Sequence, residues 1–231
     1  MISAPPRQVI LAFEASADQA SAAVLTGDGK MCQQVHAARH GHAALITELA
    51  RMVLEKTALS ARDVTHVAAG RGPGSFTGIR VALAAAKGFA LAAGAAGLGV
   101  SCLAAMAQAA REARPQLAER RIIASADTRR GSFFCQAFDP SGPADPAIIE
   151  VDSEMPAAIP DDWKGAVIVG PGAAAVASTA AGAGLTEAAD LPGLDALQVA
   201  RLAAHRIRAD ITAEPLTPLY VAPAFLGPPA R

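Results

Sequence analysis

A cluster of glycines between an apolar run and an alanine-rich segment is the first feature that could do chemistry. It reads GRGPGSFTG over residues 70–78 and follows HVAA, a short run of strand-forming character. Many proteins bind phosphate at such a turn, because N–H groups of the first helical turn point outward and glycine lets a ligand approach the backbone. Gly72, Gly74 and Ser75 are the candidate contacts. A purely structural turn is equally consistent, since Ser75 and Thr77 are both suitable N-cap residues.

Two acidic residues stand at the ends of apolar strands. Glu14 ends the run QVILAFE, with Ser16 two residues later, and Asp127 ends RIIASAD. Paired carboxylates can hold magnesium and support phosphoryl chemistry, as in nucleases of ribonuclease-H-like fold. Such sites usually need three or four acids, and the sequence offers no clear third. We predict no metal site and no cofactor. Weak binding of ATP or ADP by Glu14, Ser16, Asp127 and the glycine turn stays open.

Several catalytic motifs are absent. Gly78 is followed by Ile79, so the turn lacks the lysine of a P-loop. A dinucleotide-binding motif would have an acid after the next strand to hold the ribose. Here that strand is followed by Ser101 and Cys102. Neither G-x-S-x-G nor H-E-x-x-H occurs, which leaves hydrolase chemistry without a visible nucleophile or zinc site.

Histidines and cysteines are placed unfavourably for a metal site. One segment is rich in histidine and contains His36, His40 and His42. Gly41 interrupts it, and no acid or cysteine lies beside it to complete a metal site. The cysteines are isolated and odd in number: Cys32, Cys102 and Cys135. They lack the paired spacing of a zinc site or a disulfide framework. The N-terminal segment also lacks the pattern of a signal peptide, so we expect a cytoplasmic protein.

Composition argues against direct binding of nucleic acid and against a membrane span. The chain has 231 residues, a net charge of −1 and no block of like charge, whereas a nucleic-acid backbone is bound mainly by clustered cations. The uncharged stretch Gly88–Ala110 is rich in glycine and alanine, which drive membrane insertion weakly. There we predict a helix, a glycine turn, a short buried strand and a second helix.

The elements that carry these residues occur twice in the same order. A strand ends on Glu14 and is followed by a hairpin, a helix and a strand that runs into the glycine turn. In the second half, a strand ends on Asp127, and AVIVGPG later leads into an alanine-rich helix. We predict an α/β protein of actin-like, Hsp70-like ATPase (ribonuclease-H-like) fold, with two related lobes of mixed sheet plus helices. The lobes would be residues 1–105 and 106–231, with the last helix and tail as candidates to pack back on the first lobe.

Two segments have the pattern of interaction helices. Ala43–Lys56 carries an apolar stripe on one side, and Ile79–Ala93 is apolar nearly all round except for Arg80 and Lys87. A helix of the second kind must be buried on more than one side. It either lies within the core of its own lobe or completes a helical bundle with another chain.

The segment GRGPGSFTGIRVALAAAKGFA resembles the signature of the TsaB family, formerly called YeaZ. ILAFEAS is similar to that family's opening strand, DTRRGSFF to its D-A-R-x-G-E-x-Y segment and TPLYVAP to its C-terminal P-x-Y-L-R. The resemblance implies an actin-like fold and a non-catalytic scaffold role in making N6-threonylcarbamoyladenosine in tRNAs that read codons beginning with A. It implies that the chain binds and stabilises the transferase TsaD, helps to form the surface for the ATPase TsaE, touches tRNA through the complex and forms homodimers when alone.

Carried over residue by residue, the resemblance assigns the two apolar helices to the partner interface. The expected interface residues are Leu45, Leu49, Met52, Val53, Arg80, Leu83 and Lys87. The glycine cluster would then be a degenerate phosphate turn that aims the second helix.

Departures from the family pattern fall on four positions. Glu14 replaces an aspartate and Ser16 stands where active ATPases have glycine, which argues against nucleotide binding. Ser132 replaces the glutamate of the D-A-R-x-G-E-x-Y segment, and Ala222 replaces the arginine of the C-terminal P-x-Y-L-R. Two alternative functions stay open: a glycoprotease-like peptidase and an ATP-dependent kinase of sugar-kinase fold.

Overall fold

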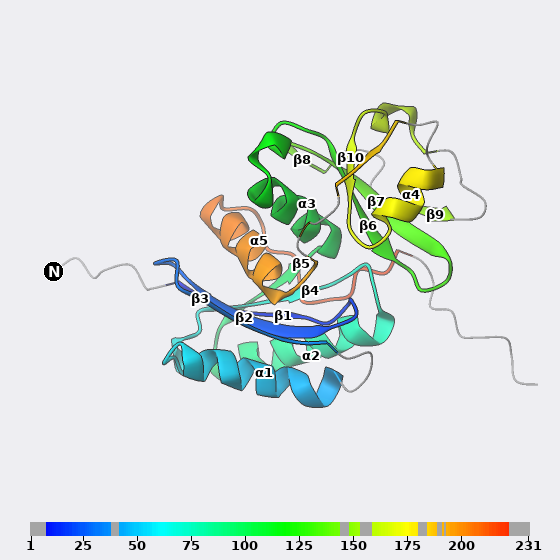
Figure 1. Ribbon diagram of the computed structural model, residues 1–231. Helices are drawn as coiled ribbons and strands as arrows, with labels where there is room; N and C mark the ends of the chain where they lie inside the picture. The colour runs from blue at the N-terminus through cyan, green and yellow to red at the C-terminus, as the bar shows by residue number, and fades with distance from the viewer. Residues whose placement is uncertain are drawn as a thin grey trace, which may run out of the picture.

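The computed structural model describes residues 8–37, 42–143, 148–152, 159–179, 184–188, 191 and 193–221. Two mixed β-sheets are layered with helices between and outside them (Figure 1). The first sheet has the strand order β3-β2-β1-β4-β5, with β1 Val9–Glu14, β2 Ala20–Thr26, β3 Met31–His36, β4 His66–Gly70 and β5 Ala96–Val100. The second has the order β11-β10-β6-β7-β8 with β9 beside β7, from β6 Ile122–Asp127, β7 Ser132–Asp139, β8 Gly142–Pro143, β9 Ile149–Asp152, β10 Val167–Val169 and β11 Thr186–Glu187. The helices are α1 His42–Lys56, α2 Phe76–Ala93, α3 Cys102–Ala113, α4 Ala173–Thr179 and α5 Ala196–Arg208.

The two sheets repeat one topology. In the first, β1 pairs antiparallel with β2 and parallel with β4. In the second, β6 pairs antiparallel with β7 and parallel with β10. Both central strands end on the predicted acids, Glu14 and Asp127. The predicted duplication of a mixed-sheet lobe is therefore confirmed.

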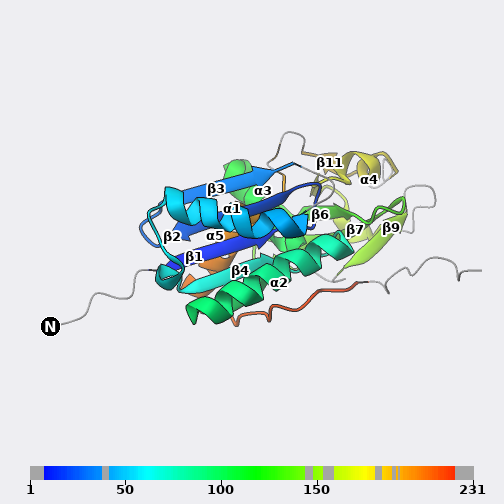
Figure 2. The same cartoon turned by 90° about the horizontal axis from the view of Figure 1, so that it is seen from below.

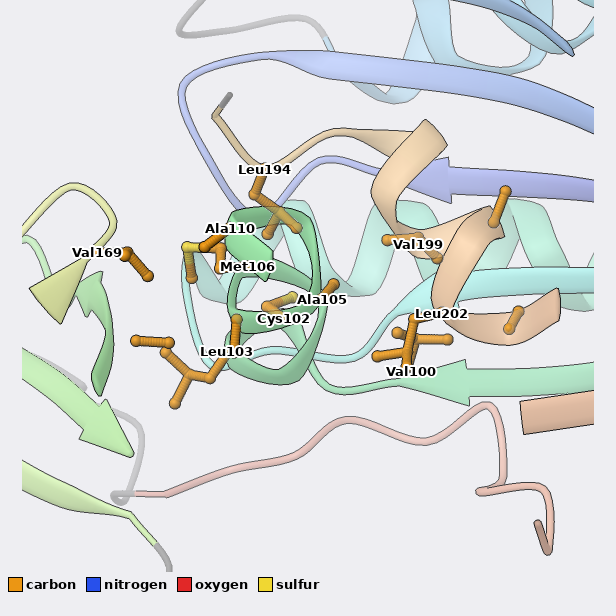
Figure 3. Close-up of a cluster of buried hydrophobic side chains, with 14 of the residues drawn as sticks. Val100, Cys102, Leu103, Ala105, Met106, Ala110, Val169, Leu194, Val199 and Leu202 are labelled. Atoms are coloured by element: carbon orange, nitrogen blue, oxygen red, sulfur yellow. The ribbon is translucent and has the colours of Figure 1, made fainter. Parts of the chain in front are cut away.

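The alternation of side chains along β1 determines which layer each of them enters. Val9, Leu11 and Phe13 pack with α1 and α2 on one face of the first sheet. Ile10 and Ala12 point to the other face, where α3 and α5 lie. The core around α3 and α5 also contains residues of the second sheet, such as Val169, which the close-up in Figure 3 places beside α3. These two helices thus form the layer that joins the sheets.

The predicted boundary between residues 105 and 106 falls inside α3. The buried side chains of α3 contribute to the core between the sheets, and α5 packs on β1 and β2 of the first sheet. The chain therefore crosses from one sheet to the other within a helix rather than in a linker.

Helix α2 starts at Phe76, three residues before the predicted Ile79, and ends at Ala93. Gly94 follows in the left-handed conformation with φ 63°, which is a common way to end a helix. Strand β5 and helix α3 come next, so the helix, turn, strand and helix predicted from Gly88 are confirmed. Among the helices described, α2 meets the length and composition criteria for a membrane span. Its inner face packs on β4 and β1, and a helix that covers a sheet can meet the same criteria.

The chain returns to the first sheet after α5. Residues 214–221, which we call the strap, run beside β5 and reach the N-terminus of α2 (Figure 2). The Gly99 N–H donates to the Glu214 carbonyl at 2.7 Å, and the Leu219 N–H donates to the Arg71 carbonyl at 2.8 Å. The strap thereby covers the β5 edge, whose backbone groups would otherwise be open to pairing with another chain.

Candidate functional site

The glycine turn is closed by the protein's own backbone. Ser75 is the N-cap of α2: its Oγ accepts from the Gly78 N–H at 3.3 Å, and its own N–H donates to the Ser16 carbonyl at 2.9 Å. A Cβ on Gly78 would lie 1.7 Å from the Ala15 carbonyl oxygen. The glycines thus allow the turn to pack tightly against the segment after β1. Thr77, the other predicted N-cap, lies within the first turn of the helix instead.

Glu14 is fully buried and does not face solvent. Its Oε1 accepts a hydrogen bond from the Ser16 N–H at 2.5 Å and another from the Ser16 hydroxyl. Its Oε2 lies 3.6 Å from the Cys102 Sγ. A Cβ on Gly70 would lie 1.6 Å from Oε2, so only glycine leaves room for this carboxyl. Burial raises the pKa of Glu14, against the opposing effect of the Ser16 hydrogen bonds.

Gly72 and Cys102 belong to the same buried cluster. The Gly72 N–H donates to the Cys102 Sγ at 3.3 Å, and burial raises the pKa of this thiol well above its ordinary value. Cys102 was not among the predicted site residues. The sequence contained one signal for its burial beside the glycine turn: Cys102 begins α3, just after the end of β5.

A small pocket between the two sheets contains the rest of the predicted nucleotide cleft. Its volume is about 220 Å³, and Ser16, Gly74 and Asp127 line it. Ligand pockets are usually ~300 Å³ or larger. Among its lining residues, the Arg129 Nη2 pairs with the Asp18 carboxylate at 2.6 Å, and the Arg129 backbone N–H donates to the Asp127 Oδ1 at 2.7 Å. Of the six predicted cleft residues these three share one pocket, whereas the other three do not line it: Glu14, Gly72 and Ser75.

An apolar groove lies between α1 and α2, which are side by side on the outer face of the first sheet (Figure 2). Its volume is about 760 Å³. The α1–α2 groove is lined by Ile46, Thr47, Ala61, Phe76, Thr77, Arg80, Val81, Ala84, Ala85, Gly88, Phe89 and Ala92. An exposed apolar area of this kind on a helical face is typical of a protein interface.

The structure separates the predicted interface residues into two groups. Arg80 lines the groove, Lys87 is exposed on the same helix, and two residues of α1 are half-buried: Leu45 and Met52. Leu49, Val53 and Leu83 are 7%, 0% and 3% exposed in the core beneath the helices. These three predictions are corrected, because the side chains point at the sheet and cannot contact a partner docked on the outer face. Several groove residues that the sequence did not single out, such as Phe76 and Ala84, also belong to α2.

The remaining predicted positions are the histidines considered for metal binding and the two departures from the family pattern at Ser132 and Ala222. Across the described part of the chain, no group of three histidine, cysteine or acidic side chains could hold a metal ion. His36 is exposed at the end of β3, while His40 and Ala222 lie outside the described residues. Ser132 is buried and donates to the Glu150 Oε1 at 2.5 Å. A carboxylate from β9 therefore stands beside the position where the family pattern has glutamate.

A protein-family model matches the middle of the chain. The model "TsaD: tRNA N6-adenosine threonylcarbamoyltransferase" matches residues 35–154, which is half of the chain. The "tRNA threonylcarbamoyladenosine biosynthesis protein TsaB" of Escherichia coli is 34% identical over 125 residues, which are 54% of this chain and 52% of that protein. The TsaB protein of Haemophilus influenzae is 33% identical over 125 residues, 54% of this chain and 51% of that protein. The chain thus spans about half the length of the curated relatives it matches.

Solved structures extend the similarity of fold to nearly the whole chain. YeaZ from Pseudomonas aeruginosa has a TM-score of 0.71 at 24% identity, covering 93% of this chain and all of that one. The ADPNP-bound activator of the 2-hydroxyisocaproyl-CoA dehydratase from Clostridium difficile has a TM-score of 0.51 at 11% identity, covering 88% and 97%. These likenesses confirm the predicted two-lobed, actin-like fold. The family model, which matches half of the chain, shows that the chain belongs to the family that the TsaD model describes, and the curated relatives that it resembles there are TsaB proteins.

Proposed function

We propose that the chain is a non-catalytic subunit that binds a TsaD-type transferase and thereby supports formation of N6-threonylcarbamoyladenosine in tRNAs that read codons beginning with A. The names of the curated relatives place them in this biosynthesis. The single observation that carries the proposal for this chain is the α1–α2 groove. Two helices of a partner docked there would complete a four-helix bundle, in which small residues such as Ala84 and Gly88 let the backbones approach closely.

The closed glycine turn supports a non-catalytic role. The first N–H groups of α2, which could otherwise bind phosphate, are partly taken by the Ser75 side chain, and the turn packs against Ser16. Glu14 is turned into the interior, so it is not available to hold a metal-bound nucleotide. We therefore propose that the chain uses no nucleotide cofactor. In an ATP titration we expect no binding at millimolar ATP, whereas micromolar binding that is lost in Asp127→Asn would favour the kinase alternative.

The rest of the assembly follows from the family resemblance and forms part of the proposal. A TsaE-type ATPase would bind the surface shared by the two proteins, and tRNA would be contacted through the complex. The free chain would use the same groove to form homodimers. Because the modified molecule is tRNA, the subunit would work in the cytoplasm, where its three cysteines stay free thiols, as they are in this structure.

Mixing the chain with the TsaD-type transferase encoded by the same genome tests the proposal. We expect multi-angle light scattering to give the mass of a one-to-one complex. Ala84→Glu places a carboxylate in the apolar groove, and burial of this charge in the interface should disfavour binding by about 3–5 kcal/mol, or about two to four orders of magnitude in Kd. Ala84 is exposed in the free chain, so its folding should be unaffected.

The matched control is Ala174→Glu, which makes the same change on an exposed position of α4, on the far side of the second sheet. This variant should bind like the wild type. Absence of a complex with the wild-type chain would overturn the proposal. Equal binding by Ala84→Glu and the wild type would show that the groove is not the interface.

A further inference from the structure

The outer face of α2 carries charge of one sign only. Arg80 and Lys87 are its only charged residues, and both are exposed. Within the described residues, neither has a carboxylate within ion-pair distance. Arg80 also lines the α1–α2 groove. The groove therefore presents an apolar floor with cations along α2.

Arg80 is held in one orientation by two aromatic rings. Its guanidinium lies 3.7 Å from the centroid of the Phe76 ring, and its Nε donates to the Tyr220 hydroxyl at 3.1 Å. The Phe76 and Tyr220 rings stack with centroids 5.5 Å apart and an angle of 26° between their planes. These contacts use the face and the Nε of the guanidinium. They leave its two terminal nitrogens uninvolved, and this pair of nitrogens can bind a carboxylate with two parallel hydrogen bonds.

Tyr220 reaches this position because the strap is fastened to β5. The Arg71 Nε donates to the Thr217 carbonyl at 2.9 Å, and the Glu214 carboxylate pairs with both Arg71 and Arg206. A Cβ on Gly99 would lie 2.3 Å from the Pro215 carbonyl oxygen, so this strand position must be glycine for the strap to pack. A segment more than a hundred residues away from α2 in sequence thus determines the orientation of an arginine at the groove.

We propose that the partner surface seated in the α1–α2 groove is a helix that carries an acidic side chain opposite Arg80, and that Tyr220 is a positioning residue for this contact. The inference rests on the proposed function and specifies the chemistry of the partner. Aromatic residues and arginine are enriched among the residues that dominate binding energy at interfaces. Two copies of α2 facing each other across a two-fold axis would bring their cations together, so the charge favours a different chain over a second copy.

The affinity for the same transferase, measured at low and at high NaCl, tests the inference. The wild-type Kd should rise with salt, because screening weakens an ion pair. Arg80→Met keeps an apolar stem but removes the charge, and should weaken binding about three- to tenfold at low salt while flattening the salt dependence. Tyr220→Phe keeps the stacked ring and removes the acceptor for Nε. It should weaken binding about two- to fivefold.

Arg208→Met is the matched control, because this exposed arginine ends α5 on the opposite face of the first sheet. It should leave both the Kd and its salt dependence unchanged. If the wild type binds but Arg80→Met binds equally well with the same salt dependence, the inference is wrong and the proposed function stands. If the wild type forms no complex, both are overturned.

Discussion

The Glu14→Gln variant tests whether a buried carboxyl holds a proton in the folded protein. Glu14 is enclosed by Ser16, Gly70 and Cys102, and the fixed charge that acts on it is the carboxylate of Asp195, which raises its pKa further. Burial therefore holds the pKa of the folded state above the ordinary value of 4.5, which the unfolded chain retains. The folded protein binds this proton more tightly than the unfolded chain does. The stability contributed is complete below the unfolded pKa and is lost as pH rises through the folded pKa.

The magnitude follows from the linkage of one proton. Between the two pKa values, the wild-type free energy of unfolding should fall by about 1.4 kcal/mol per pH unit from this group alone. The glutamine side chain of the variant cannot ionise and lacks this slope. Its Oε1 can still accept from Ser16, but its amide donates toward the Cys102 sulfur, a weak acceptor, and an unsatisfied N–H should destabilise the variant by about 1–3 kcal/mol. We expect the variant to be less stable than the wild type at low pH and to gain on it as pH rises.

Urea unfolding at several pH values between 5 and 8, followed by circular dichroism, measures this difference. Fluorescence of Trp163, the only tryptophan, reports the second sheet and checks that both lobes unfold together. Glu119→Gln is the control for loss of one negative charge, because Glu119 is exposed in the turn that precedes β6. A difference between wild type and Glu14→Gln that stays constant across this range would refute the reasoning, because it would mean that folding takes up no proton at this carboxyl.

Two further predictions concern packing. Leu83→Ala should lower the free energy of unfolding by about 2–5 kcal/mol, because this side chain fills the core beneath α2; a loss of less than ~0.5 kcal/mol in urea unfolding would contradict its placement there. Gly99→Ala should displace the strap, since the added Cβ would meet the Pro215 carbonyl oxygen at 2.3 Å. Hydrogen exchange at the Leu219 amide should then be much faster than in the wild type, and unchanged protection would show that the strap accommodates the methyl group.

Much of the fold could be predicted because it is encoded in local patterns. The apolar runs that end on Glu14 and Asp127 predicted two central strands, and the glycine turn with Ser75 predicted the start of a helix within a few residues. Repetition of this order predicted two related lobes. These features depend on side-chain alternation, on the conformational freedom of glycine and on capping, which are properties of neighbouring residues.

The candidate site depended on contacts that no local pattern contains. Helix α2 is apolar nearly all round, so only its packing on the sheet decided that Leu83 is core and Ala84 is surface. The burial of Glu14 required Cys102, 88 residues away, to close over it. Tyr220 came to α2 because the strap pairs with the β5 edge. The sequence by itself determined the elements and the family resemblance. Tertiary structure decided which faces are exposed, because burial is a property of the layers that meet and not of any single element.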